Sequence, residues 1–267
     1  MLALIAGQGA LPNIIAQVAL HNSGQMPVIC VPEGSTVVID GAFDPVPFRL
    51  ETLGSLIADL RNRGVDQLCM IGAVARPSFD PALLDAATAP LVPRLQTALM
   101  AGDDGALRVL IALFEEAGIS TIGADQIAPQ LLARAGVPTL AKPGPDVADY
   151  AKRAALILAD MGAQDSGQAC IIGPNGFSLR EDEAGTDALL ARLALPQGCV
   201  LFKAPKPSQD RRADLPVIGA TTASAAAKAG LKGLAVQAGG VMIPDISVLT
   251  AQLDRAGLFL WVYEAVG

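Results

Sequence analysis

Short apolar runs alternate with helical patterns along almost the whole chain, and this alternation strongly limits the folds that the chain can adopt. Runs that have the length and composition of buried strands occupy residues 2–6, 27–32, 67–71, 119–122, 168–173, 199–203, 231–237 and 258–263. The stretches between them, such as 50–63, carry apolar residues at helical spacing. Such alternation is typical of α/β domains. We therefore expect an α/β fold, with a further short strand at 36–39 and a short helix at 82–87.

The composition changes between residues 124 and 145, where four prolines and two glycines interrupt the pattern. Clusters of these residues favour loops. We therefore expect an N-terminal domain over 1–130, a linker over 131–145 and a C-terminal domain over 146–267. We expect the first domain to be Rossmann-like and the second to be mixed α/β, with a hairpin at Asn175-Gly176. Ligands commonly bind at domain interfaces, so we also expect an interdomain cleft.

The charge balance excludes some classes of partner. With 19 basic and 26 acidic residues, the chain has a formal net charge of −7. This argues against bulk nucleic-acid binding, which requires cations to displace counterions, and against a broadly basic membrane-binding surface. Neither argument excludes a local basic pocket. Because hydrophobic residues make up 52% of the chain and aromatic residues only 4%, the core must be aliphatic.

The four cysteines and the single histidine offer little chemistry. The cysteines lie in or beside apolar runs without metal-type spacing, so we expect reduced core residues at Cys30, Cys69, Cys170 and Cys199. His21 follows an apolar helix pattern, where a cap or surface role is expected. The first twenty residues lack Lys and Arg, unlike a signal peptide. No run of about 18 apolar residues occurs, so we expect a cytoplasmic protein.

The first strand is followed by a glycine turn. Gly7 and Gly9 precede Pro12, which is well placed to open a helix. A strand, a G-x-G turn and a helix begin many nucleotide-binding units, but the third glycine of the dinucleotide fingerprint is missing. The backbone N–H groups of Gly7 and Gly9 are candidates to bind a phosphate at the helix N-terminus. The alternative is a tight turn without a ligand.

The stretch from Lys203 to Gly219 is the most polar part of an otherwise apolar chain. Three prolines exclude a helix there and favour an extended loop. The loop carries the candidate catalytic residues Lys203, Lys206, Arg212 and Asp214, and the candidate substrate contact Gln209. Cations in such a loop can bind phosphate oxygens, and a carboxylate can bind a divalent metal or accept a proton from water. The alternative is a solvated surface loop.

Other candidate substrate contacts follow strands or begin helices: Arg76, Asp104, Arg108, Thr186 and Thr222. Arg76 follows the strand 67–71, at the strand end where α/β sheets bind ligands. Asp103 or Asp104 can instead cap the helix over 105–117. Thr186 can likewise be a helix cap. Asp187 is a candidate metal ligand.

Several sequence blocks together resemble one enzyme family. The loop has the pattern K-x-x-K-P-x-Q-D-x-R-x-D-x-P-x-I-G, and further blocks lie at 5–12, 72–77, 102–108, 185–190 and 229–235. Their order and spacing resemble those of the LpxI-type UDP-2,3-diacylglucosamine pyrophosphatases of lipid A biosynthesis. The resemblance covers residues 5 to about 240. Two departures occur, since Ala184 and Gln237 stand where members of the family often have Glu.

The resemblance implies a metal-dependent hydrolase. Members split UDP-2,3-diacylglucosamine into 2,3-diacylglucosamine 1-phosphate (lipid X) and UMP, use a divalent cation, usually Mg²⁺, and depend on an aspartate that corresponds to Asp214. They are described as two α/β domains that close over the lipid. The implied partner is thus a lipid-linked sugar nucleotide, with transient contact with the inner membrane and an oligomeric state that stays open.

Two other classes of function are compatible with parts of the sequence. A non-catalytic sugar-nucleotide-binding protein would keep Gly7 and Gly9 but would not need Asp214. A nicotinamide-dependent oxidoreductase would need the missing third glycine and an acidic residue about 20 positions further on, where Glu33 in a Pro-Glu-Gly turn is the nearest. Metal-dependent turnover, and a comparison of UMP with NAD binding, separate these alternatives.

Overall fold

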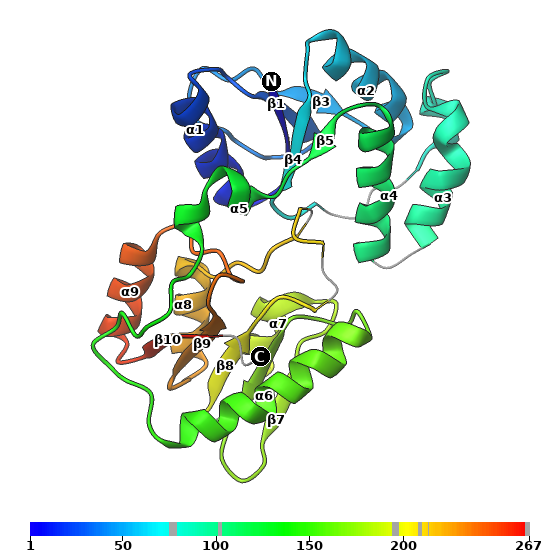
Figure 1. Ribbon diagram of the computed structural model, residues 1–267. Helices are drawn as coiled ribbons and strands as arrows, with labels where there is room; N and C mark the ends of the chain where they lie inside the picture. The colour runs from blue at the N-terminus through cyan, green and yellow to red at the C-terminus, as the bar shows by residue number, and fades with distance from the viewer. Residues whose placement is uncertain (75–78, 101–102, 194–197, 208–209, 213, 265–267) are drawn as a thin grey trace. The chain divides into compact units, whose positions relative to one another are not determined.

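The computed structural model describes residues 1–74, 79–100, 103–193, 198–207, 210–212 and 214–264 (Figure 1). The chain divides into two compact units. The first contains Met1–Pro129 and Asp210–Asp214, and the second contains Gln130–Gln209 and Leu215–Gly267. Each unit has its own sheet with helices packed on it, which confirms the expected α/β class.

The first unit contains a five-stranded sheet in the order β3-β2-β1-β4-β5, and all its strand pairs are parallel. The strands are β1 (Leu2–Ala6), β2 (Val28–Pro32), β3 (Val46–Phe48), β4 (Gln67–Ile71) and β5 (Ser120–Thr121). The helices are α1 (Leu11–Ser23), α2 (Leu53–Asn62), α3 (Val92–Met100), α4 (Asp103–Glu116) and α5 (Ala124–Ile127). Short 3-10 turns occupy Leu50–Thr52, Pro81–Leu83, Ala89–Leu91 and, at the unit boundary, Pro129–Leu131. From β1 the chain continues to β2 and β3 on one side of the sheet, while β4 and β5 lie on the other side. The topological switch point, where the strand order reverses, therefore lies between β1 and β4.

Two expected elements of this unit are wrong. The third strand lies at Val46–Phe48 and not at 36–39. The segment 36–39 instead belongs to a loop bound to the start of the unit, where Gln8 donates to the Thr36 hydroxyl. Val38 is 76% exposed, so this run is not buried as a strand would be. Because no helix separates β2 from β3, the Rossmann-like description stays a prediction.

The expected helix at 82–87 is reduced to the 3-10 turn Pro81–Leu83. The residues after that turn cap the start of α2. The Gly54 N–H donates to the Thr88 hydroxyl at 2.8 Å, and the Thr88 N–H donates to Asp85 at 2.6 Å. The segment therefore satisfies the donors of another helix and does not form one of its own.

The second unit contains a mixed sheet in the order β10-β9-β8-β6-β7. Its strands are β6 (Ala169–Ile172), β7 (Ser178–Arg180), β8 (Val200–Lys203), β9 (Gly233–Gln237) and β10 (Phe259–Tyr263). Its helices are α6 (Asp146–Ala163), α7 (Gly185–Ala191), α8 (Ala220–Lys228) and α9 (Ile246–Arg255). β6 is antiparallel to both β7 and β8, and the other pairs are parallel. The β6–β7 hairpin is confirmed, with positive φ at Asn175 and Gly176.

Two apolar layers cover the two faces of this second sheet. Cys170 and Phe202 pack with α6, while Ile171 and Leu201 pack with α7, α8 and α9. This alternation follows from the two-residue period of a strand. The segment 131–145, expected as a linker, lies in the second unit, where Gly136 and Val262 exchange backbone hydrogen bonds of 2.9 and 2.8 Å.

The four cysteines are free and buried, as expected. Burial raises the pKa of Cys30, Cys69 and Cys170 to about 12. These thiols are therefore protonated at neutral pH and are not nucleophiles. His21 is exposed in the last turn of α1, as expected.

Candidate functional site

The glycine turn after β1 lies at the switch point of the first sheet. The Gly7 N–H donates to the Ile71 carbonyl at 2.8 Å, and a Cβ at Gly7 would lie 2.5 Å from the Ala73 carbonyl oxygen. Gly7 therefore allows β1 and β4 to approach closely, and its N–H is already engaged. Gly9 has a φ of 110°, and within the described parts of the chain no atom beyond its own neighbours lies within 4 Å of the position that a Cβ would take. Gly9, two residues before α1, is the member of the pair whose surroundings fit a ligand.

Residues 210–214 belong to the first unit, although the chain reaches them from β8 of the second. The Asp214 N–H donates to the Asp210 carbonyl at 3.2 Å, which closes the segment into a turn. Arg211 donates to Asp125 of α5 at 2.9 Å. Gly123, which follows β5, leaves room for the Arg211 carbonyl, since a Cβ there would lie 3.0 Å from that oxygen. The turn that carries Asp214 is therefore held near the carboxyl end of β5.

A cluster of charges fixes this turn on α4. The Arg212 guanidinium donates to both oxygens of Asp210, at 2.9 and 2.6 Å, and to Glu115 at 2.5 Å. The hydrogen bond from Arg212 lowers the pKa of Asp210 against the opposing effect of partial burial, and the charge of Arg108 lowers it further. The hydrogen bond to Asp210 in turn raises the pKa of Arg212. Arg212 thus binds two carboxylates, and its predicted contact with phosphate stays a prediction.

Four further candidates lie either on α4 or outside the described residues. Arg108 is exposed on α4, two helical turns from Glu115. Asp104 lies in the first turn of α4, so its backbone is helical rather than that of a preceding cap residue. Arg76 and Gln209 lie outside the described residues. Arg108 lies near enough to the charge cluster of the turn for its charge to lower the pKa of Asp210.

In the second unit, Thr186 links Lys203 to Glu181, an acidic residue that is not among the predicted site residues. The Lys203 ammonium, at the end of β8, donates to the Thr186 hydroxyl at 2.9 Å and to the Val217 carbonyl at 3.2 Å. Thr186 donates to Glu181 at 2.5 Å. Lys203 and Glu181 are each only 7% exposed. The signal for Glu181 was its place directly after the strand 178–180, one turn before the helix that carries Thr186.

The other candidates of the second unit have local partners or are exposed. Lys206 forms an ion pair with Asp165, the second residue after α6. Thr222 lies in the first turn of α8, where its hydroxyl accepts the Gly219 N–H at 3.3 Å, which is a helix-capping contact. Asp187 is exposed in the first turn of α7. Thr186 lies inside α7 and binds Glu181, so the alternative that it caps this helix is wrong.

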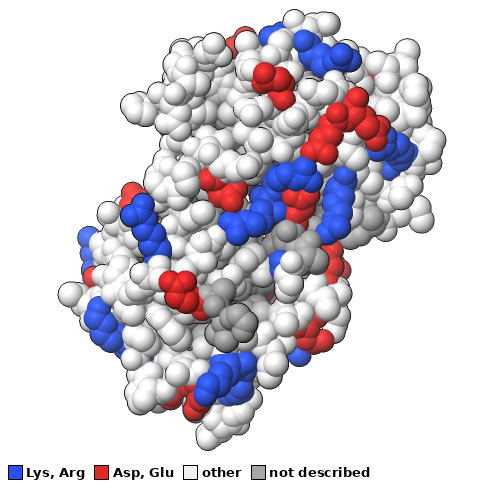
Figure 2. Space-filling view, in the orientation of Figure 1, with Lys and Arg blue, Asp and Glu red and all other residues white. Residues whose placement is uncertain are grey.

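Basic and acidic side chains lie side by side on the face shown in Figure 2. Most of the ion pairs in the described parts of the chain are exposed, such as those of Arg94 with Glu116 and of Lys152 with Asp149. Exposed pairs contribute little to stability. The pair of Lys206 with Asp165 is less exposed, since the Lys206 side chain is only 15% exposed.

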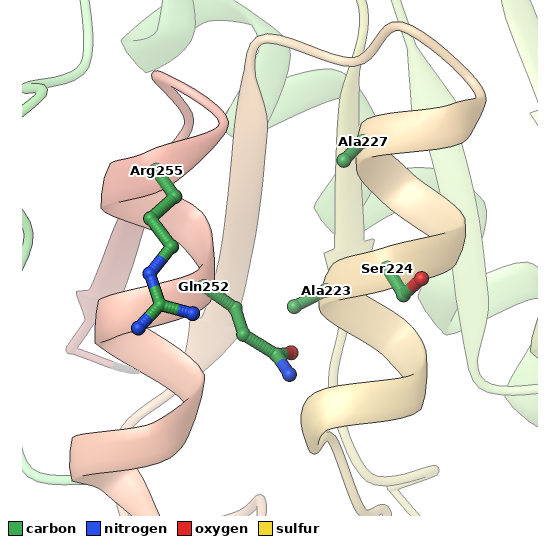
Figure 3. A pocket seen from close by; sticks show the side chains of 5 residues that line it. All are labelled: Ala223, Ser224, Ala227, Gln252 and Arg255. Atoms are coloured by element: carbon green, nitrogen blue, oxygen red, sulfur yellow. The ribbon is translucent and has the colours of Figure 1, made fainter.

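A shallow pocket of ≈ 250 Å³ lies between α8 and α9 (Figure 3). Its lining residues are Ala223, Ser224, Ala227, Gln252 and Arg255. The Gln252 side chain points from α9 toward α8, and its Oε1 is buried without a hydrogen-bond partner in the described part of the protein. None of these lining residues is a predicted site residue.

The carboxylates of the described residues do not form a preassembled metal site. Among the described residues, no group of three or more His, Cys, Asp or Glu side chains is arranged to hold a metal ion. Mg²⁺ is commonly bound by one or two carboxylates together with waters and substrate phosphates. Asp214, on its fixed turn, and the exposed Asp187 are carboxylates of the required kind. Either carboxylate by itself is of a kind that can bind Mg²⁺ when a phosphate supplies further oxygens.

Comparison with known proteins covers nearly the whole chain. A family model described as "LpxI N-terminal domain" matches residues 1–131, and one described as "LpxI C-terminal domain" matches residues 134–261. The chain is 32% identical over 272 aligned residues to a protein of Caulobacter vibrioides named UDP-2,3-diacylglucosamine pyrophosphatase LpxI. The alignment covers 97% of this chain and 96% of that relative. No helix in the described parts of the chain has the length and apolar character needed to cross a membrane.

Proposed function

The chain belongs to the LpxI family, and from this premise we propose that it hydrolyses the pyrophosphate bond of UDP-2,3-diacylglucosamine. The products would be 2,3-diacylglucosamine 1-phosphate and UMP, within lipid A biosynthesis. The observation that carries the proposal is the relative of that name, which aligns over 97% of the chain. Family membership also confirms the resemblance inferred from the sequence blocks.

In this reaction, the oxygen of a water molecule bonds to a phosphorus atom while the bond from that phosphorus to the bridging oxygen breaks. The leaving phosphate takes the electron pair of the broken bond. Negative charge on the phosphate oxygens opposes the attack, so cations near them stabilise the transition state. The Lys203 ammonium, which is buried and donates to Thr186 and Val217, is the proposed cation for this role.

Asp214 is the proposed catalytic carboxylate. Its backbone is fixed by the turn hydrogen bond to Asp210, and that turn is held by the charges around Arg212. Asp214 can accept the proton of the attacking water, or it can bind a cation that orients this water. The turn hydrogen bond, which fixes the Asp214 backbone, supports both roles.

We further propose that the reaction requires Mg²⁺ or another divalent cation. Asp214, with Asp187 as a second candidate, would hold it together with phosphate oxygens of the substrate. When bound, the cation would neutralise charge on the phosphates and polarise water. Gly9 would contribute its backbone N–H to a phosphate or to the uridine side of the substrate, because the described residues leave space beside its Cα.

The acyl chains of the substrate lead us to propose transient contact with the inner membrane surface. Washing membranes with high salt should release the protein, because the contact would be peripheral. Quantitative recovery in the membrane pellet after that wash would contradict this part of the proposal.

The central test is a turnover assay with purified protein and UDP-2,3-diacylglucosamine, in which UMP and the diacylglucosamine phosphate are measured. We expect both products in equal amounts with added Mg²⁺. Substrate binding without either product would instead support the alternative, a non-catalytic sugar-nucleotide-binding protein. Tight binding of NAD in preference to UMP would support an oxidoreductase.

A further inference from the structure

Glu181 and Lys203 lie in one row across the sheet of the second unit. Ala169 of β6 is in register with Lys203 of β8, and its carbonyl accepts the N–H of Glu181, which directly follows β7. Side chains of residues in register on neighbouring strands share a face of the sheet. Ala169 packs with Leu189 and Leu190 of α7, so Glu181 and Lys203 also point toward α7. Two strand spacings, roughly 10 Å in total, separate their backbones.

Thr186 of α7 bridges this separation, and the chemistry of its neighbours fixes the direction of each hydrogen bond. An ammonium group only donates, and an ionised carboxylate only accepts. The Thr186 hydroxyl must therefore accept from Lys203, at 2.9 Å, and donate to Glu181, at 2.5 Å. The result is a one-way chain from a buried cation to a buried anion.

The backbone around Glu181 is shaped to hold its carboxylate. The second oxygen accepts the Gln168 N–H at 2.6 Å. Gly167 has a φ of 152°, and a Cβ there would lie 3.1 Å from both the Cβ and Oε2 of Glu181. A buried carboxylate is costly unless it is paired and hydrogen-bonded. Both of its oxygens have partners here, so the carboxylate is held in one position.

We propose that Glu181 is a positioning residue, which holds the Lys203 ammonium in place for a substrate phosphate through the Thr186 hydroxyl. This inference rests on the proposed function. A lysine side chain is flexible and loses rotamer freedom when it binds. Glu181 and Thr186 fix the ammonium before the substrate arrives, which reduces that loss. Neither residue needs to touch the reacting atoms.

The test compares kcat and KM for Glu181→Gln with those for Glu183→Gln. The control makes the same chemical change two residues away, on an exposed side chain. Loss of a hydrogen bond to a charged group should lower kcat/KM by about tenfold to a hundredfold in Glu181→Gln, while Glu183→Gln keeps the wild-type value. Thr186→Val should show a similar loss, and Thr186→Ser should restore most of it, because serine keeps the hydroxyl.

A double-variant experiment separates positioning from general support of the fold. If Glu181 acts only through Lys203, adding Glu181→Gln to Lys203→Ala should change kcat/KM by less than about twofold. Full additivity of the two losses would overturn the inference, as would a Glu181→Gln enzyme with wild-type kcat/KM. If Glu181→Gln does not fold, equal activity of Thr186→Val and Thr186→Ser would overturn it.

If the proposed function is wrong, the folded wild-type protein will show no turnover. The hydrogen-bond chain can then still be followed by NMR of the Lys203 ammonium protons, whose exchange with water should be slow in wild type and at least tenfold faster in Thr186→Val, by the same hydrogen-bond energy. Unchanged exchange in Thr186→Val would show that Thr186 does not hold the ammonium, and would overturn the inference.

Discussion

At the scale of single residues, charged side chains hold the turn that carries Asp214. Arg212 binds Asp210 with two parallel hydrogen bonds, and the Asp210 carbonyl accepts the Asp214 N–H. Asp210 therefore joins the ion pair to the backbone of the catalytic candidate. Bidentate arginine–carboxylate pairs are geometrically specific, so the direction of the turn depends on this pair.

Asp214 itself gives the most direct prediction for the reaction. Asp214→Ala should fold normally and lose at least about 10² in turnover, whether the carboxylate accepts a proton or binds a cation. Asp214→Asn should lose nearly as much, because an amide cannot accept the proton and binds metal weakly. Circular dichroism checks the fold. Substrate binding should persist, because Lys203 remains. Turnover within about tenfold of wild type in a folded Asp214→Ala protein would show that the turn is only structural.

Arg212 gives a prediction for the pH dependence of stability. The hydrogen bond from Arg212 lowers the pKa of Asp210 in the folded protein, so its stabilising effect is fully present above the unfolded value of about 3.9 and is lost as the pH falls through the folded value. Arg212→Gln should therefore lower Tm most near pH 7 and least near pH 3. The control is Arg61→Gln, which removes the same charge from an exposed helix end. A Tm difference that stays constant over this pH range would contradict the argument.

At the scale of elements, the buried strands were the easiest parts to predict. The predicted ranges 2–6 and 67–71 agree with β1 and β4, because a fully buried strand is a continuous apolar run. The expectations for 36–39 and 82–87 were wrong because contacts distant in sequence hold these segments, with Gln8 donating to Thr36 and the Asp85 N–H donating to the Glu51 carbonyl. The pairing of Glu181 with Thr186 and Lys203 depends on the register of three strands, which local patterns do not contain.

Gly7 gives a prediction about the junction of β1 and β4. A Cβ at this position would meet the backbone of Ala73 at 2.5 Å and of Gly72 at 2.7 Å. Backbone cannot move aside as a side chain can, so Gly7→Ala should lower the free energy of unfolding by about 1–3 kcal/mol. Urea unfolding of the two proteins measures this difference. Equal midpoints and slopes would show that the strands can separate without loss.

At the scale of the whole molecule, the stretch from Lys203 to Gly219 belongs to both units. Its first part, with Lys203 and Lys206, lies in the second unit, and residues Asp210–Asp214 lie in the first. The sequence showed one motif, and its division between two sets of contacts could not be predicted from proline spacing. The division is relevant to function because the proposed cation for the phosphate and the proposed catalytic carboxylate are then supported by separate cores.

The requirement for a divalent cation is the last prediction, and it concerns the protein and substrate together. Mg²⁺ keeps several waters and is usually held by one or two carboxylates plus substrate phosphates. With Asp214 and Asp187 as the candidate carboxylates, the cation should bind weakly to the free protein and more tightly when a phosphate is present. EDTA should lower turnover by about 10² or more, and excess Mg²⁺ should restore it. If Asp187 is a ligand, Asp187→Asn should raise the Mg²⁺ concentration needed for half-maximal rate, because only Asp214 then remains. The control is Asp182→Asn, which changes an exposed neighbour that is paired with Arg192. Full turnover in EDTA would remove the cation from the proposal and leave Asp214 as the base that takes the proton from water.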